Sequence, residues 1–239
     1  MKAECFFGMK VSLIIPALNE AESLPSVIAA VPRDTVTDII VVDNGSRDDT
    51  GNVARRAGAR VLYESRRGYG AACWAGFEAA ADADILVFMD GDGSFSPGEI
   101  PRLTAPIAGG AADLVLGTRT RRPEDARGIP FHARFGNRFV AWLIGRVTPL
   151  RATDMGPFRA VSRNLLDRLH MKERTYGWPC EMMIKAAKLG CRVEEVPVSY
   201  RERTAGHSKV SGSLRGSVGA SLSMFKVVAR WSRWSPEDR

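Results

Sequence analysis

The chain is predicted to fold as a single α/β domain with a mainly parallel sheet, because short apolar runs alternate with helical stretches over its first 90 residues. The apolar runs are too short for core helices and are continuous, which is typical of strands buried on both faces. Short links between strand and helix favour parallel neighbours with helices on both sides of the sheet. These observations predict a Rossmann-like arrangement.

The first half of the chain supplies the regular part of this pattern. Strands are expected at residues 11–15, 38–42, 60–63 and 84–89. Helices are expected between them at residues 19–30, 48–57 and 71–81. Gly68-Tyr69-Gly70 is half of a dinucleotide-binding fingerprint, but it follows the third strand and lacks the third glycine, so a tight strand-to-helix turn is favoured.

The second half is less regular. Strands are expected at residues 113–117, 156–161 and 192–198, the middle one at an edge of the sheet. Helices are expected at residues 135–147, 180–189 and 215–231. Residues 119–134 form a predicted loop with five arginines, and residues 201–212 form a loop rich in Gly, Ser and Lys.

Composition and charge indicate a globular protein with anionic partners. Apolar residues make up 45% of the 239 residues and charged residues 26%, which is ordinary for a folded domain. The net charge is +7, and residues 201–239 carry eight Lys/Arg against three Asp/Glu. Such a balance suits phosphorylated substrates, acidic lipids or nucleic acid. No apolar run reaches the roughly 18 residues that cross a bilayer, and the four cysteines lack zinc-binding spacing.

The candidate functional residues follow the expected strands, where open α/β sheets bind ligands. They are Pro16, Asn19, Glu20, Asp43, Asp90 and Asp92. Asp90 and Asp92 are one residue apart after an apolar strand, and their carboxylates could hold Mg²⁺ or Mn²⁺ while leaving room for phosphate oxygens. A calcium loop is excluded, because Phe95 and Pro101 stand where it needs Gly and Glu.

Several segments in order resemble the family 2 glycosyltransferases with the GT-A fold. The segments are Val11–Glu20, Ile40–Thr50 and Met89–Asp92. Further segments resemble the polyprenyl-phosphate (dolichyl-phosphate) mannosyl- and glucosyltransferase branch of that family: Gly117–Arg119, Thr153–Arg159, Glu181–Ala186, Glu195–Val198 and Arg203–Lys209. The resemblance covers about residues 10–212.

The resemblance implies a metal-dependent inverting enzyme that moves a hexose from a GDP-mannose or UDP-glucose type of donor to a polyprenyl phosphate. Its nucleotide site would comprise Pro16, Asn19, Glu20, Asp43 and Asp90, with the metal on Asp90 and Asp92. Its phosphate contacts would be Arg119, Arg203, Ser208 and Lys209, and its catalytic residues Asp92, Arg119, Asp154 and Glu181, the last two facing the sugar. Two features depart from the branch: Ser94 replaces a common Gln, and the membrane-spanning helices of several bacterial relatives have no counterpart.

The acceptor decides whether a base is needed. A lipid phosphate is already an anion and requires only positioning and charge screening, whereas a hydroxyl acceptor must lose a proton to a carboxylate. Asp154 is the first candidate for that base and Glu181 the second. Both residues also have purely structural interpretations, Asp154 as the partner of an arginine and Glu181 as a charge at a helix N-terminus.

The expected domain organisation is a leader (1–9), the GT-A domain (10–212) and a basic amphipathic helix with a tail (213–239). The helix carries an apolar stripe followed by two tryptophans: Val218, Leu222, Phe225, Ala229, Trp231 and Trp234. This pattern suits a helix in the lipid headgroup region, and hence a cytoplasmic protein peripheral to the inner face of the membrane. Packing on the domain, or binding a membrane-protein subunit, is left open.

Two other classes of protein remain as alternatives. A sugar nucleotidyltransferase should have a glycine-rich basic loop after the first strand, where this chain has Pro16-Ala-Leu-Asn-Glu20. A basic RNA- or lipid-binding module should interleave charge with aromatic residues on one face, whereas the strand ends here are acidic. Nucleic acid is therefore not expected as a partner.

Overall fold

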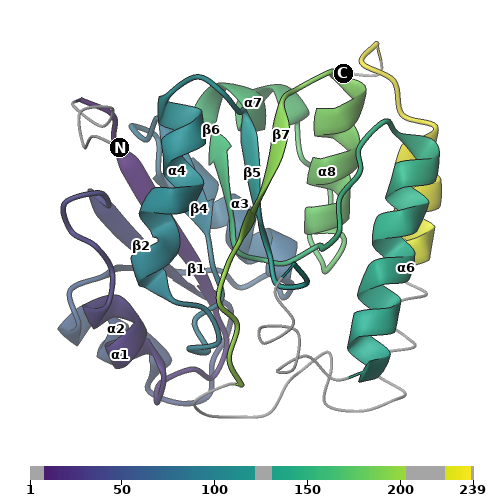
Figure 1. Cartoon of the computed structure of the whole chain (residues 1–239). Coiled ribbons are helices and arrows are strands. Elements are labelled where there is room, and N and C mark those ends of the chain that lie inside the picture. Colours follow the sequence, from purple (N-terminus) through teal and green to yellow (C-terminus); the bar gives the residue numbers. More distant parts are fainter. Residues whose placement is uncertain (1–7, 122–130, 203–223, 238–239) are drawn as a thin grey trace.

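A seven-stranded sheet in the order β3-β2-β1-β4-β6-β5-β7 runs through the computed structural model of the chain (Figure 1). The structure describes residues 8–121, 131–202 and 224–237, and only the backbone of 131–133. The strands are β1 (Val11–Ala17), β2 (Asp38–Asp43), β3 (Arg60–Tyr63), β4 (Ile85–Phe88), β5 (Leu114–Thr118), β6 (Arg159–Ser162) and β7 (Val193–Pro197). The mainly parallel α/β fold that the sequence predicts is confirmed.

The position of β6 corrects one expectation. The predicted strand at 156–161 is not at an edge, because β6 lies between β4 and β5 and runs antiparallel to both. Ala160 and Val161 are fully buried, one on each face of the sheet. Arg159 is also buried, and its guanidinium donates to the backbone carbonyl of Gly156 at 2.6 Å. A buried interior strand thus begins with a charged residue whose two terminal guanidinium nitrogens donate to backbone carbonyls, whereas its Nε has no hydrogen-bond partner among the described residues.

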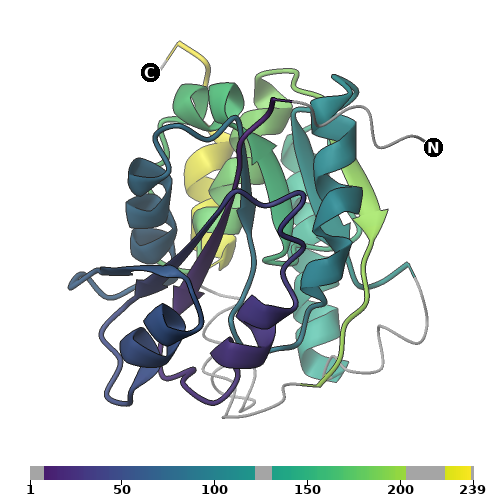
Figure 2. The ribbon, with the colours of Figure 1, turned by 90° about the vertical axis from the view of Figure 1, so that its left-hand side faces the viewer.

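Helices cover both faces of the sheet (Figure 2). They are α1 (Leu24–Ala29), α2 (Thr50–Arg56), α3 (Tyr69–Ala79), the 3₁₀ turn η2 (Pro97–Glu99), α4 (Ile100–Ala108), α6 (Phe131–Val147), α7 (Arg163–Leu169), α8 (Trp178–Lys188) and a last helical stretch at 224–232. Helices α4 and α7 are not among those that the sequence predicts. The first helix begins later than the predicted residue 19, because Asn19 has a left-handed φ of 54° and belongs to a loop.

Alternating side chains of the strands form two cores. Ile14 and Ile40 pack on the face covered by α3, α6, α7 and α8, whereas Leu13 and Ile39 pack on the face covered by α1 and α4. Each such side chain, when fully buried, stabilises the fold by about 1.5–3 kcal/mol. The two cores hold the strands in one register, so all parallel strands present their carboxyl ends at the same edge.

The last helix packs against the domain. Val227, Val228, Trp231 and Trp234 are buried in the cluster that includes α6 and α8. The expectation that the two tryptophans lie in lipid headgroups is therefore wrong for this structure, although Phe225 is 49% exposed. Val218 and Leu222 lie outside the described residues. No helix in the described ranges combines the length and apolar character that crossing a bilayer requires.

A tight turn joins β3 to α3. Gly68 has φ 143°, and a Cβ at this residue would lie 2.2 Å from the carbonyl oxygen of Arg174. A Cβ at Gly70 would lie 2.6 Å from the carbonyl oxygen of Glu173. The Gly70 N–H donates to the carbonyl of Thr175 at 3.1 Å. Both glycines therefore allow the first turn of α3 to contact the backbone of residues 173–175.

We predict that Gly70→Ala lowers the free energy of unfolding by about 1–3 kcal/mol, because the added methyl group meets backbone that cannot rotate away. Gly98→Ala is the matched control, since the nearest atom to its new Cβ is the Ser96 side-chain oxygen at 3.7 Å. Urea unfolding of both variants measures the difference. Equal stability of the two variants would contradict the close contact.

Candidate active site

The loops after β1 and β2 are bonded to each other at the carboxyl edge of the sheet. The Asn19 N–H donates to the Ser46 hydroxyl at 2.9 Å, and the Arg47 N–H donates to the Asn19 side-chain oxygen at 2.7 Å. Asn is among the residues that tolerate the left-handed conformation that this exchange requires. The two loops therefore form one polar corner rather than two separate turns.

The residues predicted to bind the nucleoside meet at this corner. Pro16 is the penultimate residue of β1 and Asp43 is the last residue of the adjacent strand β2, and Asp43 accepts a hydrogen bond from the Ser46 N–H at 2.8 Å. The Glu20 N–H donates to the Thr50 hydroxyl at 2.9 Å. Pro16, Asn19, Glu20 and Asp43 are thus brought together by strand pairing and by bonds between the loops.

Asp90 and Asp92 follow β4, next to this corner. The Ser23 hydroxyl donates to the Gly91 carbonyl at 2.7 Å, and a Cβ at Gly91 would lie 2.9 Å from the side chain of Leu24. Asp92 is buried and accepts hydrogen bonds from the Ser94 N–H at 2.9 Å and the Ser94 hydroxyl at 2.6 Å. Ser94, the departure from the branch, therefore orients one carboxylate oxygen of Asp92.

Asp90 and Asp92 are the residues that could hold a hard divalent cation, which would take further ligands from its substrate. Carboxylate oxygens are ligands that Mg²⁺ accepts, and it usually keeps positions for water and phosphate oxygens. Within the described ranges, no group of three or more His, Cys, Asp or Glu residues could enclose a metal ion. A metal held by Asp90 and Asp92 would therefore depend on the donor's phosphates to complete its ligands.

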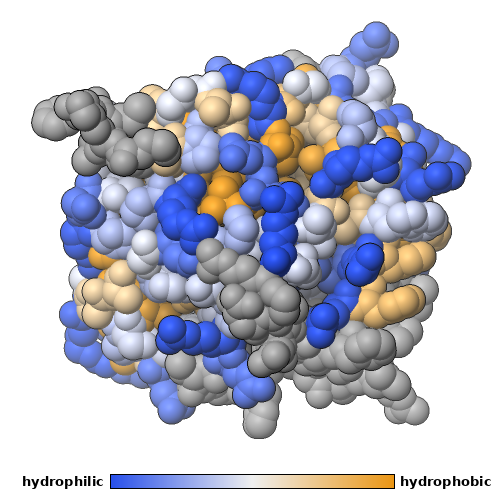
Figure 3. Space-filling model, in the orientation of Figure 1, coloured by the Kyte–Doolittle hydropathy of each residue, from blue (hydrophilic) through white to orange (hydrophobic). Residues whose placement is uncertain are grey.

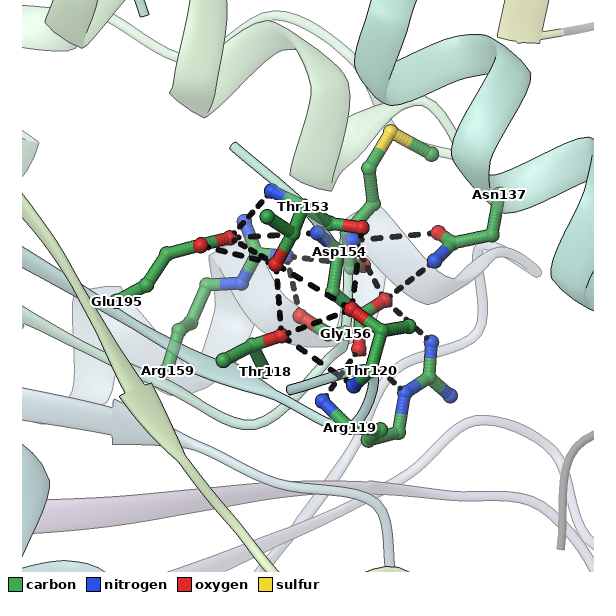
Figure 4. A network of polar contacts seen from close by, with 10 residues as sticks. Thr118, Arg119, Thr120, Asn137, Thr153, Asp154, Gly156, Arg159 and Glu195 are labelled. Carbon is green, nitrogen blue, oxygen red and sulfur yellow. Dashed lines mark hydrogen bonds and ion pairs between the residues drawn. The ribbon is translucent and has the colours of Figure 1, made fainter. Parts of the chain in front are cut away.

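A buried ion pair between Arg119 and Asp154 lies at the end of β5 (Figure 4). The Arg119 Nε and Nη2 each lie 2.8 Å from a different oxygen of Asp154, and the Arg119 N–H donates to the same carboxylate at 2.8 Å. The Asn137 side-chain amide and the Met155 N–H supply two more hydrogen bonds. Asp154 is 1% exposed, so these five hydrogen bonds replace its water.

Both members of the pair are held in their charged forms. Burial raises the pKa of Asp154, but the charge and hydrogen bonds of Arg119 lower it more, so this pKa lies below its ordinary value. Burial lowers the pKa of Arg119, and Asp154 more than reverses that effect. Asp90 is among the charges that raise the pKa of Arg119, which places the acidic loop near this guanidinium.

Two neighbours hold the ion pair in place. The Glu195 carboxylate accepts hydrogen bonds from the Thr153 N–H at 2.6 Å and the Asp154 N–H at 3.3 Å. The Tyr200 ring lies under the Arg119 guanidinium, with 5.1 Å from Cζ to the ring centroid. The next residue, Arg201, donates its N–H to the Ser94 carbonyl at 2.9 Å, so the segment after β7 lies against the acidic loop.

Glu181, expected to face the sugar, lies in the protein interior. Its side chain is fully buried and pairs with Lys185 at 2.6 Å. Its two oxygens accept the N–H groups of Lys172 and Glu173 at 2.7–3.1 Å. Burial lowers the pKa of Lys185, which the Glu181 carboxylate only partly offsets. The structural interpretation of Glu181 accounts for all of these contacts.

Sequence reasoning missed several residues that shape the site. The Asn44 side chain joins the end of β2 to the loop between β3 and α3, because its amide donates to the Glu64 and Arg66 carbonyls while its oxygen accepts the Gly68 N–H at 2.7 Å. Its position directly after the acidic strand end was an available signal. Asn137 in α6 and Tyr200 carried no comparable signal. Arg203, Ser208 and Lys209 lie outside the described residues.

Comparisons with known proteins identify the family of the chain. Residues 12–170 match the family described as glycosyl transferase family 2. An uncharacterized glycosyltransferase of Mycobacterium tuberculosis is 44% identical over 222 residues, which are 93% of this chain and 99% of that protein. The undecaprenyl-phosphate mannosyltransferase of Micrococcus luteus is 34% identical over 242 residues, 93% of this chain and 96% of its own.

A solved structure shows the same architecture. Glucosyl-3-phosphoglycerate synthase from Mycobacterium tuberculosis, in complex with Mn²⁺, UDP and glucosyl-3-phosphoglycerate, has a TM-score of 0.75 and 25% identity. The match covers 95% of this chain and 81% of that chain. The fold and the acidic strand ends define a glycosyltransferase of the GT-A class. The chain belongs to glycosyl transferase family 2, so the nucleotidyltransferase and binding-module alternatives no longer apply.

We predict that Asp154→Asn lowers the free energy of unfolding by about 3–5 kcal/mol near neutral pH, because it leaves the buried charge of Arg119 without its partner. The pKa of Asp154 is lowered by folding, so its stabilisation is full above the unfolded value of about 3.9 and is lost as pH falls through the folded pKa. The difference in the free energy of unfolding between wild type and variant should therefore become smaller below pH ~4. Denaturant titrations at several pH values measure it.

The matched control is Asp167→Asn, whose carboxylate is 53% exposed and pairs with Arg163 at 3.1 Å. An exposed pair contributes about 0–1 kcal/mol, so this variant should stay close to wild type. If Asp154→Asn were no less stable than this control at neutral pH, the ion pair would not stabilise the fold.

Proposed function

We propose that this glycosyltransferase moves a hexose from a nucleotide-sugar to a polyprenyl phosphate, with inversion, and with Mg²⁺ or Mn²⁺ on Asp90 and Asp92. The observation that carries the proposal is the complete engagement of Asp154 by Arg119, Asn137 and the Met155 N–H. A carboxylate held by five hydrogen bonds is a poor general base, so an acceptor that needs none is favoured.

Two further carboxylates, those of Glu181 and Glu195, are engaged in the same way. Glu181 is held by Lys185 and two backbone N–H groups, and Glu195 by Thr153, the Asp154 N–H and Arg121. If a hydroxyl acceptor gave its proton to Asp154, Glu181 or Glu195, that carboxylate would first have to leave its partners. A phosphate acceptor is already an anion and can attack directly. The hydroxyl alternative with Asp154 as base is therefore disfavoured.

The reaction is a single displacement. An oxygen of the acceptor phosphate forms a bond to the anomeric carbon while the bond from that carbon to the nucleoside diphosphate breaks, and the bonding electrons leave with the diphosphate. The configuration inverts because attack and departure occur on opposite faces. A bound divalent ion would stabilise the negative charge on the leaving diphosphate. No proton transfer is required from the protein.

The other residues of the site bind the nucleoside, contact the phosphates or position the backbone. The corner formed by Asn19, Glu20 and Asp43 binds the nucleoside, and Arg119 faces the phosphates with its guanidinium fixed by Asp154 and Tyr200. Glu181 acts as a positioning residue through the backbone of residues 172–173. Arg203, Ser208 and Lys209 remain proposed phosphate contacts, and Arg201, which precedes them, lies against the acidic loop.

The names of similar proteins support the substrate classes. The Micrococcus luteus relative is an undecaprenyl-phosphate mannosyltransferase, and the Mycobacterium tuberculosis neighbour was crystallised with Mn²⁺ and UDP. We propose on the same grounds that the chain works at the cytoplasmic face of a membrane, by its own surface or with a membrane-protein subunit. A donor screen with UDP-glucose, GDP-mannose and UDP-GlcNAc identifies the base and sugar.

We predict that Asp92→Ala abolishes metal-dependent transfer while the protein stays folded. The reason is that Asp90 alone would leave the ion with one carboxylate from the chain. Asp82→Ala is the control, because Asp82 is 88% exposed in the turn before β4, at the opposite end of that strand from Asp90 and Asp92. Turnover at several Mn²⁺ and Mg²⁺ concentrations, together with melting curves, measures the effect. Activity near that of wild type at ordinary metal concentration would remove Asp92 from the metal site.

We predict that transfer to a polyprenyl phosphate rises with pH through the second ionisation of the acceptor, at pH about 6, and that Asp154→Asn keeps this rise. Polyprenol itself should accept no sugar. The measurement is kcat/KM against pH for both acceptors, at a temperature where the variant is folded. Transfer to polyprenol, or loss of the rising limb in Asp154→Asn, would support a base role instead.

A further inference from the structure

Helix α6 exposes three aromatic side chains on one face. Phe135 is 68% exposed, Phe139 42% and Trp142 56%. Their spacing of four and then three residues places them on the same side of a helix. Phe139 and Trp142 stack with ring centroids 5.8 Å apart. Figure 3 shows hydrophobic surface at the right, where α6 lies in Figure 1.

This α6 outer face (Phe135, Arg138, Phe139, Trp142 and Arg146) also carries positive charge. The whole helix contains three arginines and no Asp or Glu. Arg134, Arg138 and Arg146 are exposed, and the Arg146 guanidinium lies 5.9 Å from the Trp142 ring. Aromatic rings interleaved with arginines, without acidic residues, match the chemistry of an anionic lipid surface.

The opposite side of α6 belongs to the active site and the core. Val140 and Ile144 are buried in the cluster that also contains the last helix. Asn137 donates to Asp154 and accepts the Met155 N–H at 3.2 Å. The helix begins at the edge of the sheet where the parallel strands end (Figure 1). One rigid element therefore connects the exposed aromatic face to the ion pair of the site.

We propose that the α6 outer face docks on an anionic bilayer and holds the active site at headgroup depth. This inference rests on the proposed function, because the phosphate of a polyprenyl acceptor lies at that depth. Anionic headgroups complement the arginines, whereas two copies paired through this face would bring like charges together. The last helix cannot supply the anchor through its tryptophans, since Trp231 and Trp234 are buried.

The test is co-sedimentation of the full chain with vesicles of phosphatidylcholine alone or mixed with phosphatidylglycerol, at low and high salt. The wild-type chain should bind the anionic vesicles at low salt and dissociate from them at high salt, because salt screens the attraction between arginines and headgroups. Arg138→Gln with Arg146→Gln should weaken binding about fivefold per charge removed. Phe135→Ser with Phe139→Ser and Trp142→Ser should weaken it at least about tenfold.

Matched controls separate docking from general effects. Arg33→Gln with Arg168→Gln removes two exposed arginines elsewhere, and Tyr63→Ser removes a side chain that is 72% exposed on β3. These variants should bind like wild type. Equal binding by the aromatic variant and Tyr63→Ser, or the same loss in both arginine pairs, would overturn the proposal. Binding of wild type to neither vesicle would overturn it too and favour a protein partner for this face.

A second readout distinguishes this proposal from the proposed function. Transfer is measured to a long polyprenyl phosphate in vesicles and to a short, water-soluble prenyl phosphate without vesicles. The aromatic variant should lose transfer in vesicles and keep transfer to the soluble acceptor, with an unchanged melting curve. Equal transfer in vesicles by the variant and wild type would overturn the docking surface alone. Failure of wild type with both acceptors would overturn the proposed acceptor.

Discussion

The arrangement of the site depends on the buried ion pair between Arg119 and Asp154. It joins the end of β5 to the segment before β6, and Asn137 extends the connection to α6. Removing two charges from water is costly, and the cost is met here by bidentate geometry and further hydrogen bonds. The same geometry that keeps the guanidinium oriented also leaves the carboxylate with no free oxygen for a base role, which is the ground for the proposed acceptor. Structural stability and the proposed choice of acceptor thus rest on one contact.

The first four strands and the positions of Asp43, Asp90 and Asp92 could be predicted from sequence because each depends on local pattern. A buried parallel strand is a continuous apolar run, and the topology of such sheets places the next residues at a common edge. That rule places Asn19 near Asp43 and Ser46, and the hydrogen bonds between the two loops complete the corner. The family resemblance then added Arg119 and Asp154, which no local pattern singled out.

The remaining features depend on contacts between distant segments. Nothing in the four residues of β6 says that they separate β4 from β5, because that placement is decided by the sheet's pairing. Glu181 looks like a helix N-terminal charge or a catalytic group, and only the buried Lys185 and the backbone of 172–173 decide between them. Trp231 and Trp234 fit a membrane surface or a core equally well by pattern, and they pack on Lys185.

The interior position of β6 has a consequence for synthesis and folding. Strands β1 to β4 can pair among themselves, and so can β5 and β7, but only β6 joins the two groups. Until residue 162 has left the ribosome, β4 and β5 each present an unpaired edge, a template for pairing with other chains. Closure of the sheet is thus a late, long-range event, because some seventy residues separate β4 from its partner strand β6 in the sequence.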